Sequence, residues 1–276
     1  MLMRQDARGL ALQAVKWSAA SADRIVPPPR GVVLLQYHRV GGRAPVEIDL
    51  PSARFQEQMS LVADEQRATT LDRALELLCG TAEPERDPVV VTFDDGTADF
   101  ADCAVPVLVR YGIPVVLYLA TAYIENQSSF PHDGVPLSWT ALRDLATTGL
   151  VTVGSHTHTH ALLDRLDESV VAAELDTSIG LLEDRLGLRA RHFAYPKGVA
   201  GSPTAAAAVQ RRFASAALAD VGVNRYGRTN PYRLARSPIQ NSDGMHWFTR
   251  KLHGGLALEG TVRRALNHRR YAGLVS

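Results

Sequence analysis

Two short motifs place chemically reactive side chains at fixed spacing in this 276-residue sequence. Asp94 and Asp95 lie side by side in TFDDG (residues 92–96), directly after an apolar run. A DDG sequence also suits a turn or a helix cap, so the pair alone does not decide between structure and catalysis. At the end of a buried strand, two carboxylates are costly to desolvate and their side chains point in different directions. One could then bind a metal while the other faces a reactant.

The second motif, GSHTHTH at residues 154–160, gathers three of the nine histidines of the chain. His156 and His160 are four positions apart, and on a helical turn or a tight loop this spacing lets two imidazoles reach one ion. In an extended segment the alternation would place His158 on the same face, so His158 is a rival ligand that we rank below the other two. A lone histidine is usually structural, whereas this clustering indicates a metal site.

Together the two motifs predict a hydrolytic metal site. Two histidines and one carboxylate, with coordination positions left open for water, are typical of such sites. The second carboxylate would serve as the general base on that water. Both motifs follow apolar runs, and the carboxyl ends of parallel strands meet at one edge of a sheet. We therefore expect the two motifs to converge in space.

The combination of TFDDG, a later SHTxxH and FAYPKG (residues 193–198) resembles the polysaccharide deacetylases, carbohydrate esterase family 4, which carry the NodB-homology domain. The resemblance extends from about residue 31 to residue 239, and YHRV at residues 37–40 is closest in style to the exopolysaccharide and chitooligosaccharide deacetylases. It implies an α/β fold, namely a distorted (β/α) barrel with about seven parallel strands in a single domain. It also implies the removal of acetyl groups from glycans.

The resemblance further implies a role for each motif residue. Asp94 would be the general base, and Asp95, His156 and His160 would bind the metal. The backbone N–H of Lys197, between the proline and the glycine of the third motif, would donate to the oxyanion, because amide hydrolysis builds a negative tetrahedral oxygen. Zn²⁺ is the expected ion, with Co²⁺ and Ni²⁺ as alternatives, since imidazole-rich sites accept these ions as well.

Two positions depart from the family pattern. Many members carry an arginine in the third motif that positions the general base, where this chain has Ala194, and many carry a tyrosine where it has Lys197. We expect Arg236, in LARSP near the last candidate strand, to supply the missing guanidinium, and the alternative is an arginine on a surface turn. The family's late histidine, its usual general acid, has no clear equivalent, because His246 and His253 fall in a helical tail.

His38 is a better candidate for the general acid. It stands in YHRV at the end of the first apolar run. In a barrel the end of the first strand adjoins the ends of the others, so we predict that His38 lies in the active site. The alternative is a histidine that only anchors the first loop.

Short apolar runs alternate with helical patterns along the chain, which predicts a parallel sheet with crossover helices. Strands buried on both faces form nearly continuous apolar runs. Such runs occur at residues 31–37, 89–93, 115–119, 150–153, 192–194 and 214–218, with a further candidate at 234–237. Helices are expected at residues 52–64, 71–78, 99–111, 138–147, 167–186 and 204–212, and the longest irregular loop at residues 123–136.

We divide the chain into an N-terminal helical extension (residues 1–30), the deacetylase barrel (31–242) and a helical, basic C-terminal tail (243–276). In the extension, Leu10, Ala14 and Trp17 have the spacing of an amphipathic helix, which we expect to pack on the domain, with docking to a membrane or a partner as the alternative. Charged and polar residues interrupt its apolar runs, so no signal peptide is expected. No segment approaches the ~20 apolar residues of a membrane span.

The amino-acid composition limits the classes of partner that the protein is expected to bind. Lys plus Arg number 30 against 29 for Asp plus Glu, and a formal net charge of +1 provides no field for holding nucleic acid. Cys79 and Cys103 form no recognisable motif, and we interpret both as small buried side chains. With no export signal visible we expect a cytoplasmic protein, with a peripheral membrane location as the alternative. The expected partner is a carbohydrate, either an N-acetylated glycan or a lipid-linked sugar, and the oligomeric state is left open.

The predicted function is a metal-dependent hydrolase that removes N-acetyl groups from a sugar or polysaccharide. An O-acetyl esterase on a glycan remains an alternative, because ester and amide hydrolysis share a tetrahedral intermediate. A catalytically inactive carbohydrate-binding homologue is the second alternative, because the third motif lacks its arginine.

Overall fold

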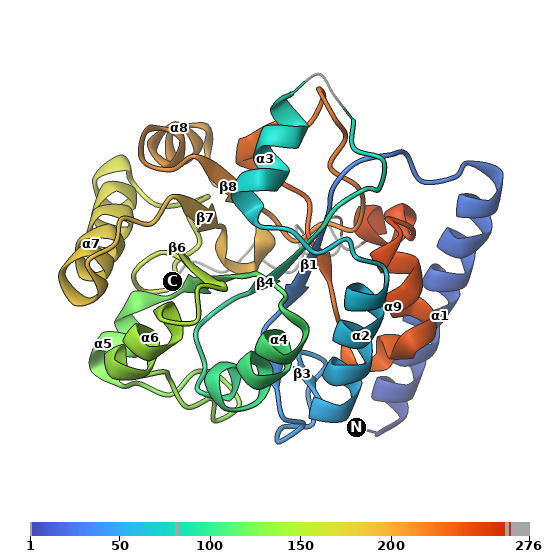
Figure 1. Ribbon diagram of the computed structural model, residues 1–276, viewed down its shortest axis with the longest axis horizontal. Coiled ribbons are helices and arrows are strands. Elements are labelled where there is room, and N and C mark those ends of the chain that lie inside the picture. Colours follow the sequence, from blue (N-terminus) through green and yellow to red (C-terminus); the bar gives the residue numbers. More distant parts are fainter. Residues whose placement is uncertain (1, 81–82, 263–264, 266–276) are drawn as a thin grey trace.

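A computed structural model describes residues 2–80, 83–262 and 265 of the chain (Figure 1). Its described part contains a seven-stranded sheet with the order β8-β7-β6-β5-β4-β1-β9, in which every pair of neighbours is parallel. The strands are β1 (Val33–Tyr37), β4 (Val89–Phe93), β5 (Val115–Leu119), β6 (Val151–Ser155), β7 (His192–Ala194), β8 (Ser215–Ala217) and β9 (Ser237–Pro238).

The segment that ends in β9 joins the two edges of this sheet. Leu234 forms a parallel bridge with Ala217 of β8, and three residues later Ser237 pairs with Leu35 of β1. The sheet is thereby curled into a distorted (β/α) barrel within a single domain, which confirms the predicted fold class.

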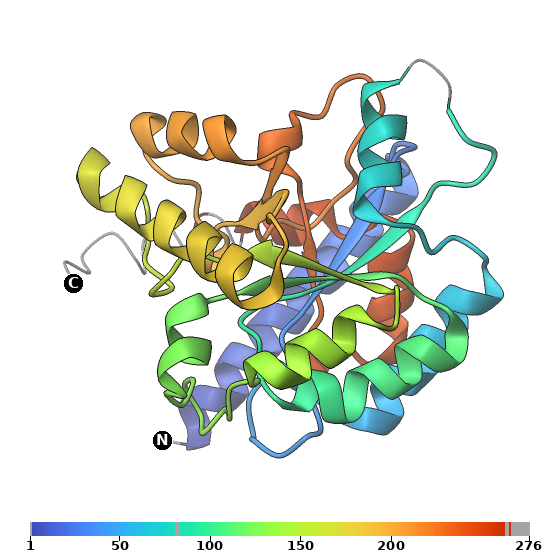
Figure 2. The same cartoon turned by 60° about the vertical axis from the view of Figure 1, so that its left-hand side comes forward.

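Helices surround the outer face of the curled sheet, except α3 (Leu71–Cys79), which packs against the inner-face residues Leu34 and Val90 (Figures 1 and 2). They follow the strands along the chain, as a parallel sheet with crossover connections requires. The helices are α1 (Leu2–Ile25), α2 (Ser52–Asp64), α3 (Leu71–Cys79), α4 (Val105–Tyr111), α5 (Thr121–Asn126), α6 (Trp139–Ala146), α7 (Glu168–Leu186), α8 (Pro203–Arg212) and α9 (Gly244–Leu252). Short 3₁₀ turns lie at η2 (Pro196–Gly198), η3 (Pro231–Arg233) and η4 (Asn241–Asp243).

Each central strand is buried on both faces because its side chains alternate between two apolar clusters. In β1, Val33 and Leu35 pack into the large cluster shared with α2, α4, α7 and α9, whereas Leu34 packs into a smaller cluster on the opposite face. Gln36 and Thr92 lie on the same side as Leu34, nearer the carboxyl ends of their strands. The inner face of the barrel therefore changes from apolar to polar toward the end where Asp94 and Asp95 lie.

The predicted strands and helices recur with shifts of a few residues at their ends. Three segments differ from expectation. The predicted irregular loop at residues 123–136 begins inside α5, and a two-stranded sheet of β2 (Arg39–Val40) and β3 (Asp49–Leu50) was not predicted. The helix predicted at 99–111 begins as a π-helical turn (η1, Phe100–Ala104).

Two expectations about burial were wrong. In α1, Ala14 and Trp17 are exposed, and the buried face holds Lys16 together with Ala19 and Ala20, because a carboxylate on another element neutralises the Lys16 ammonium. Cys79 is exposed at the end of α3, and Cys103 is partly buried. The basic residues of the predicted tail, at positions 263, 264 and 268–270, lie outside the described residues.

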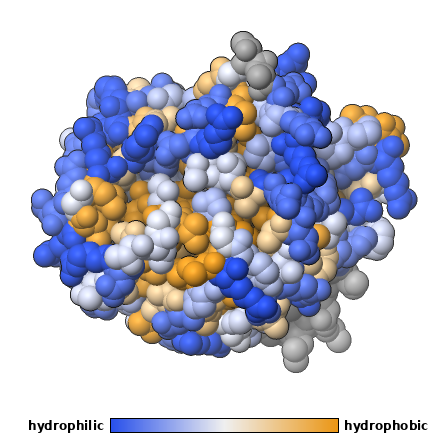
Figure 3. Space-filling model, viewed as in Figure 1, coloured by the Kyte–Doolittle hydropathy of each residue, from blue (hydrophilic) through white to orange (hydrophobic). Residues whose placement is uncertain are grey.

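The molecular surface is mixed. On the face shown in Figure 3, hydrophilic residues form most of the rim, and hydrophobic residues gather toward the middle. Ile25, the last residue of α1, and Val26, which follows it, are 82% and 73% exposed. Among the described residues, no helix combines the length and the apolar character that crossing a bilayer requires.

Candidate active site

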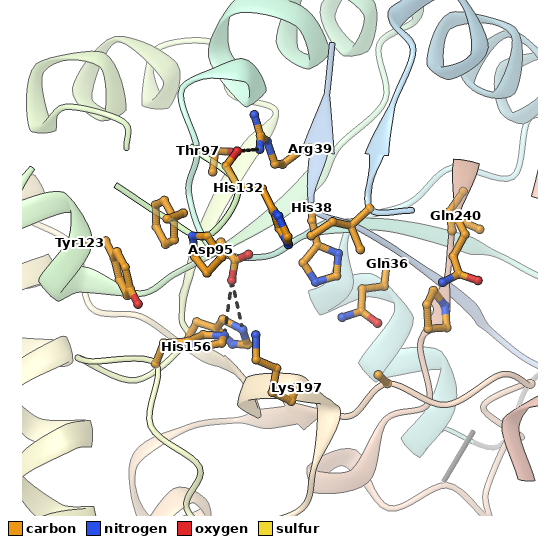
Figure 4. A pocket seen from close by; sticks show the side chains of 17 residues that line it. Gln36, His38, Arg39, Asp95, Thr97, Tyr123, His132, His156, Lys197 and Gln240 are labelled. Carbon is orange, nitrogen blue, oxygen red and sulfur yellow. Dashed lines mark hydrogen bonds and ion pairs between the residues drawn. The ribbon is translucent and has the colours of Figure 1, made fainter. Parts of the chain in front are cut away.

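A cavity of about 310 Å³ lies at the carboxyl ends of the strands, where the sequence motifs were expected to meet (Figure 4). The residues that line it are Gln36, His38, Arg39, Ile48, Asp95, Thr97, Tyr123, Phe130, Pro131, His132, His156, His160, Lys197, Ala219, Pro238, Ile239 and Gln240.

The two aspartates of TFDDG face different surroundings. Asp94 is buried directly after β4, where its backbone N–H donates to the Tyr37 carbonyl of β1. At Asp95 the backbone turns sharply, with φ 76°, and the Asp95 side chain reaches the cavity. Gly96 continues the turn with φ 102°, and a Cβ there would lie 2.5 Å from Leu119 Cδ2. This turn separates the two carboxylates, and a positive φ at a non-glycine residue is often associated with a functional site.

The histidine motif begins in β6 and then loops back toward Asp95. His156 follows β6, and its Nδ1 donates to the carbonyl of Ala194 at 2.7 Å, which leaves the Nε2 lone pair directed toward the aspartates. His160 reaches the same place because its backbone adopts φ 64°. His158 is bound elsewhere, with Nδ1 3.0 Å from the Thr121 hydroxyl of α5.

Asp95, His156 and His160 form a group that could hold a metal ion. The Asp95 Oδ1 atom lies 3.5 Å from His160 Nε2 and 3.7 Å from His156 Nε2. One ligand atom from each residue lies within 4.8 Å of the other two, and His158 is not part of the group. Two imidazole nitrogens and one carboxylate oxygen suit Zn²⁺ and related ions, so the side chains present fit the predicted metal.

Burial keeps the two histidines of this group neutral. It lowers the pKa of His156 although Asp94 and Asp95 both oppose the shift. It lowers the pKa of His160 to about 3, with His156 and Lys197 acting in the same direction against Asp95. For Asp95, burial raises the pKa, but His38, His160 and His156 outweigh it and the net shift is downward. The three donors therefore have free lone pairs near neutral pH, as metal ligation requires.

Arg236 lies against Asp94. Its Nη1 and Nη2 donate to the two carboxylate oxygens at 2.5 and 2.8 Å, and both side chains are almost fully buried. Thr92 accepts a further bond from Nη1 at 3.3 Å, and the guanidinium stacks 5.2 Å above the Tyr118 ring. Burial raises the pKa of Asp94, but Arg236 and then His156 outweigh it and hold that pKa well below its usual range. Asp94 is thus an ionised, oriented carboxylate.

Gln36 of β1 and His38, which directly follows this strand, complete the surroundings of Asp94. His38 is partly buried, with Nε2 3.9 Å from Asp94 Oδ2. Gln36 donates from Nε2 to the same oxygen at 2.7 Å. Gln36 was not predicted as a site residue, although the alternation of β1 places it on the inner side of the barrel, where a polar residue is unusual.

The third motif forms a tight turn at the cavity rim. Lys197 has φ 56°, and Gly198 follows with φ 65° so close to the chain that a Cβ would lie 2.1 Å from the Ala219 Cβ. The Lys197 side chain is exposed and directs its ammonium group toward Asp95 and His156 (Figure 4). Ala194, where many family members have arginine, contributes only its carbonyl, which holds His156.

A second set of contacts holds the loop between His156 and His160, which we call the metal-motif loop. These contacts were not predicted from the sequence. Glu174 of α7 accepts from the backbone N–H groups of His158 and Thr159 at 3.0 and 2.8 Å, and from the Thr159 hydroxyl at 2.7 Å. The only signal in the sequence was an acidic residue on the otherwise apolar stripe of a long helix. Glu174 thereby fixes the loop between the two metal-ligand candidates.

Comparisons with known proteins agree with this fold and site. Residues 81–214 match the family model for polysaccharide deacetylase. The Bacillus subtilis protein named "Putative polysaccharide deacetylase YxkH" is 24% identical over 171 residues, which cover 62% of this chain and 58% of that protein's length. IcaB from Ammonifex degensii is 25% identical with a TM-score of 0.71, and the match covers 80% of this chain and 98% of IcaB.

A further solved structure shares the fold. The Streptococcus pyogenes deacetylase PplD, in complex with acetate, is 20% identical with a TM-score of 0.72 over 81% of this chain and 98% of PplD. Residues 81–214, which contain the TFDDG, SHTxxH and YPKG motifs, match the polysaccharide deacetylase family, and these motifs lie at the mouth of one barrel. In this region the chain is similar to the polysaccharide deacetylases of carbohydrate esterase family 4, which carry the NodB-homology domain.

Proposed function

We propose that this protein is a metal-dependent hydrolase that removes the N-acetyl group from an N-acetylated sugar. The observation that supports this most directly is the convergence of Asp95, His156 and His160 on one point, with the separately held carboxylate of Asp94 beside them. A metal centre next to a general base is the arrangement that water-dependent acyl hydrolysis needs. The acetate bound to the structurally similar PplD is the product that this reaction would release.

The proposed division of labour follows from the contacts. An ion held by Asp95, His156 and His160 would supply Lewis acidity, which polarises the acetyl carbonyl and acidifies a water. Asp94 accepts the proton of the attacking water, and Arg236 keeps this carboxylate ionised and oriented. Since its lowered pKa makes Asp94 a weak base, it suits a water that is already acidified.

The remaining roles concern the oxyanion and the leaving group. The backbone N–H of Lys197 stabilises the negative oxygen of the tetrahedral intermediate, because the strained turn holds it at the cavity rim. His38, whose Nε2 lies 3.9 Å from Asp94 Oδ2, protonates the departing sugar amine. Breaking the C–N bond then releases acetate and a free amino sugar.

The test is acetate release from acetylated oligosaccharides by zinc-loaded protein, followed by mass spectrometry. An N-acetylated chito-oligosaccharide should lose 42 mass units per event, roughly the mass of the lost C₂H₂O. An O-acetylated xylo-oligosaccharide assayed in parallel separates amide from ester hydrolysis. Asp94→Asn is the matched control, because it keeps the size of the side chain and removes the base. Release that is undiminished in this variant would exclude Asp94 as the base.

A pH profile tests the proposed acid. Because a donor must be protonated to act, His38→Gln should flatten the alkaline limb of kcat and lower its maximum by about 10²-fold. An unchanged alkaline limb would remove His38 from the mechanism and leave the metal centre and Asp94 in place.

A further inference from the structure

Two cationic side chains, Arg39 and Lys197, line the cavity at the candidate active site. Asp95 is the only carboxylate among its described lining residues, and it belongs to the candidate metal group, whose histidines His156 and His160 are neutral. The amide side chains of Gln36 and Gln240 add further hydrogen-bond donors. Such a lining favours a ligand that carries negative charge.

Most of the full charges at this cavity are matched inside the protein. The Arg39 guanidinium donates to Asp99 Oδ2 at 2.9 Å and lies 3.8 Å from Asp49 Oδ2. The Arg236 and Asp94 charges neutralise each other beneath the cavity floor. Arg39 also donates to the His132 carbonyl at 2.9 Å, so its position is fixed by the protein and it is not free to turn toward a ligand.

Lys197 differs from these groups. It forms no ion pair with any carboxylate of the described residues. Its backbone lies in the tight turn at φ 56°, between Pro196 and Gly198, which packs against Ala219, and from this turn the ammonium points into the cavity (Figure 4). The chain has only three lysines, and Lys16 and Lys251 are both buried against Asp243. Lys197 is therefore the exposed one, and its charge lacks an internal partner.

We propose that the Lys197 ammonium binds an acidic group of the substrate, so that the preferred substrate is an N-acetylated sugar bearing a carboxylate or a phosphate. This inference rests on the proposed deacetylase function and names the substrate class of the same site. An exposed lysine is strongly hydrated and suits a flexible point contact with such an anion. The side-chain contact would select the substrate, whereas the backbone N–H of the same residue is the proposed oxyanion donor.

Matched substrates separate this role from a general effect on catalysis. N-acetylmuramic acid and N-acetylglucosamine differ by a carboxylate-bearing group, and N-acetylglucosamine 1-phosphate and methyl N-acetylglucosaminide differ by a phosphate. In Lys197→Met, the ratio of kcat/KM for the acidic sugar to that for its neutral counterpart should fall about tenfold, through KM. Lys197→Arg should restore most of the ratio. The pair of sugars whose kcat/KM ratio falls shows whether Lys197 binds a carboxylate or a phosphate.

Binding is measured independently of turnover. After reductive ¹³C-methylation, the Lys197 dimethylamine signal is identified by its loss in Lys197→Arg, and it should shift on titration with the acidic sugars and stay in place with the neutral ones. Because the ion contact is exposed, 1 M NaCl should suppress the shift. An unchanged kcat/KM ratio in Lys197→Met, or a Lys197 signal that ignores acidic sugars, would overturn the proposal. If no substrate releases acetate, the proposed hydrolysis fails, and the titration still decides the Lys197 contact.

Discussion

The contact between Asp94 and Arg236 shows how this chain orients the carboxylate that we propose as the general base, without the arginine that many relatives carry in the third motif. The guanidinium arrives from the segment before β9 and occupies both carboxylate oxygens. Bidentate pairs of this kind restrict orientation as well as adding attraction. We infer that Arg236 positions the base and takes no direct part in binding the metal.

Arg236→Ala should therefore reduce turnover strongly while leaving zinc affinity near that of the wild type. We expect kcat to fall by about 10²-fold or more, because the base loses its orientation. The pKa of Asp94 should rise once the guanidinium is gone, so the acid limb of the pH–rate profile should move to higher pH. Stopped assays of acetate release across pH measure both effects.

Stability must be controlled in this comparison, since removing one partner of a buried ion pair costs about 3–5 kcal/mol. Arg236→Lys keeps the positive charge but loses the bidentate hydrogen bond to Asp94. Melting curves show the temperature range in which each variant is folded, so that turnover is compared only there. Wild-type turnover in folded Arg236→Ala would show that Arg236 is only structural.

The histidine pKa values make a second prediction at this scale. Both imidazoles have lowered pKa values, that of His160 being about 3, so protons compete with the metal less than they would at ordinary histidines. Between about pH 7.5 and about pH 5.5, zinc affinity should fall less than it would for two ordinary histidines, which would lose up to tenfold each per pH unit below about 6.5. Equilibrium dialysis with metal analysis measures this, and a steep loss across that interval would contradict it.

At the scale of elements, α7 acts on the site without contributing a side chain to the cavity. Three hydrogen bonds from the metal-motif loop converge on Glu174. Both backbone donors need an acceptor, and the carboxylate supplies acceptors only. The loop between His156 and His160 is held in shape by this contact.

Glu174→Gln should loosen that loop, because its amide group places donors where an acceptor is required. We expect a loss of about 1–3 kcal/mol in the free energy of unfolding and a drop of about tenfold in zinc affinity. Denaturation with and without zinc, and zinc titration, measure the two effects. Glu168→Gln on the same helix is the matched control, since Glu168 is exposed and contacts only Arg211 at 3.8 Å among its recorded ion pairs. Equal zinc affinity in both variants would contradict the role of Glu174.

At the scale of the whole molecule, a buried ion cluster ties the N-terminal helix to the cavity wall. Lys16 of α1 lies 2.5 Å from Asp243 Oδ1, and Lys251 of α9 donates to Asp243 Oδ2 at 2.8 Å and to the Pro238 carbonyl at 2.7 Å. Asp243 also accepts from the backbone of Gln240, and both Pro238 and Gln240 line the cavity. We therefore propose that the N-terminal extension forms part of the folded unit.

Lys16→Met should destabilise the protein by about 3 kcal/mol, because it leaves a buried carboxylate with one cation fewer. The expected fall in melting temperature is roughly 6–12 °C for a chain of this size. Arg24→Met, in the exposed last turn of the same helix, is the control and should change little. Identical melting temperatures for Lys16→Met and the wild type would show that α1 is not part of the cooperative unit.

The same cluster predicts how stability depends on pH. Burial raises the pKa of Asp243, but Lys251 and Lys16 outweigh it, so the pKa in the folded protein lies below the ordinary value of 3.8. A carboxyl group with a lowered pKa contributes stability that is fully present above its unfolded pKa and is lost as the pH falls toward the folded one. Melting temperatures of the wild type should fall below about pH 4, and less so for Lys16→Met, whose Asp243 pKa is lowered less.

The local pattern of apolar residues was sufficient to predict most of the strands and helices. The apolar runs at residues 89–93, 115–119 and 192–194 became strands with the same bounds, because continuous burial leaves a signature that needs no distant partner. The alternation of strands and helices then implied that polar residues at strand ends share one edge. In this way the sequence predicted that Asp94, Asp95, His156 and His160 lie close together.

The features that local patterns did not predict depend on contacts between residues that are distant in the sequence. No local pattern shows that Lys16 is buried, that Glu174 accepts from a loop, or that Gln36 holds Asp94, because each depends on a partner on another element. The choice between His158 and His160 depended on the positive φ angles of Thr157 and His160, which bring the His160 ring to Asp95 while a hydroxyl on α5 binds His158. Residue order specifies side chains and periodicity, whereas the direction of a side chain in a turn depends on the packing of the whole barrel.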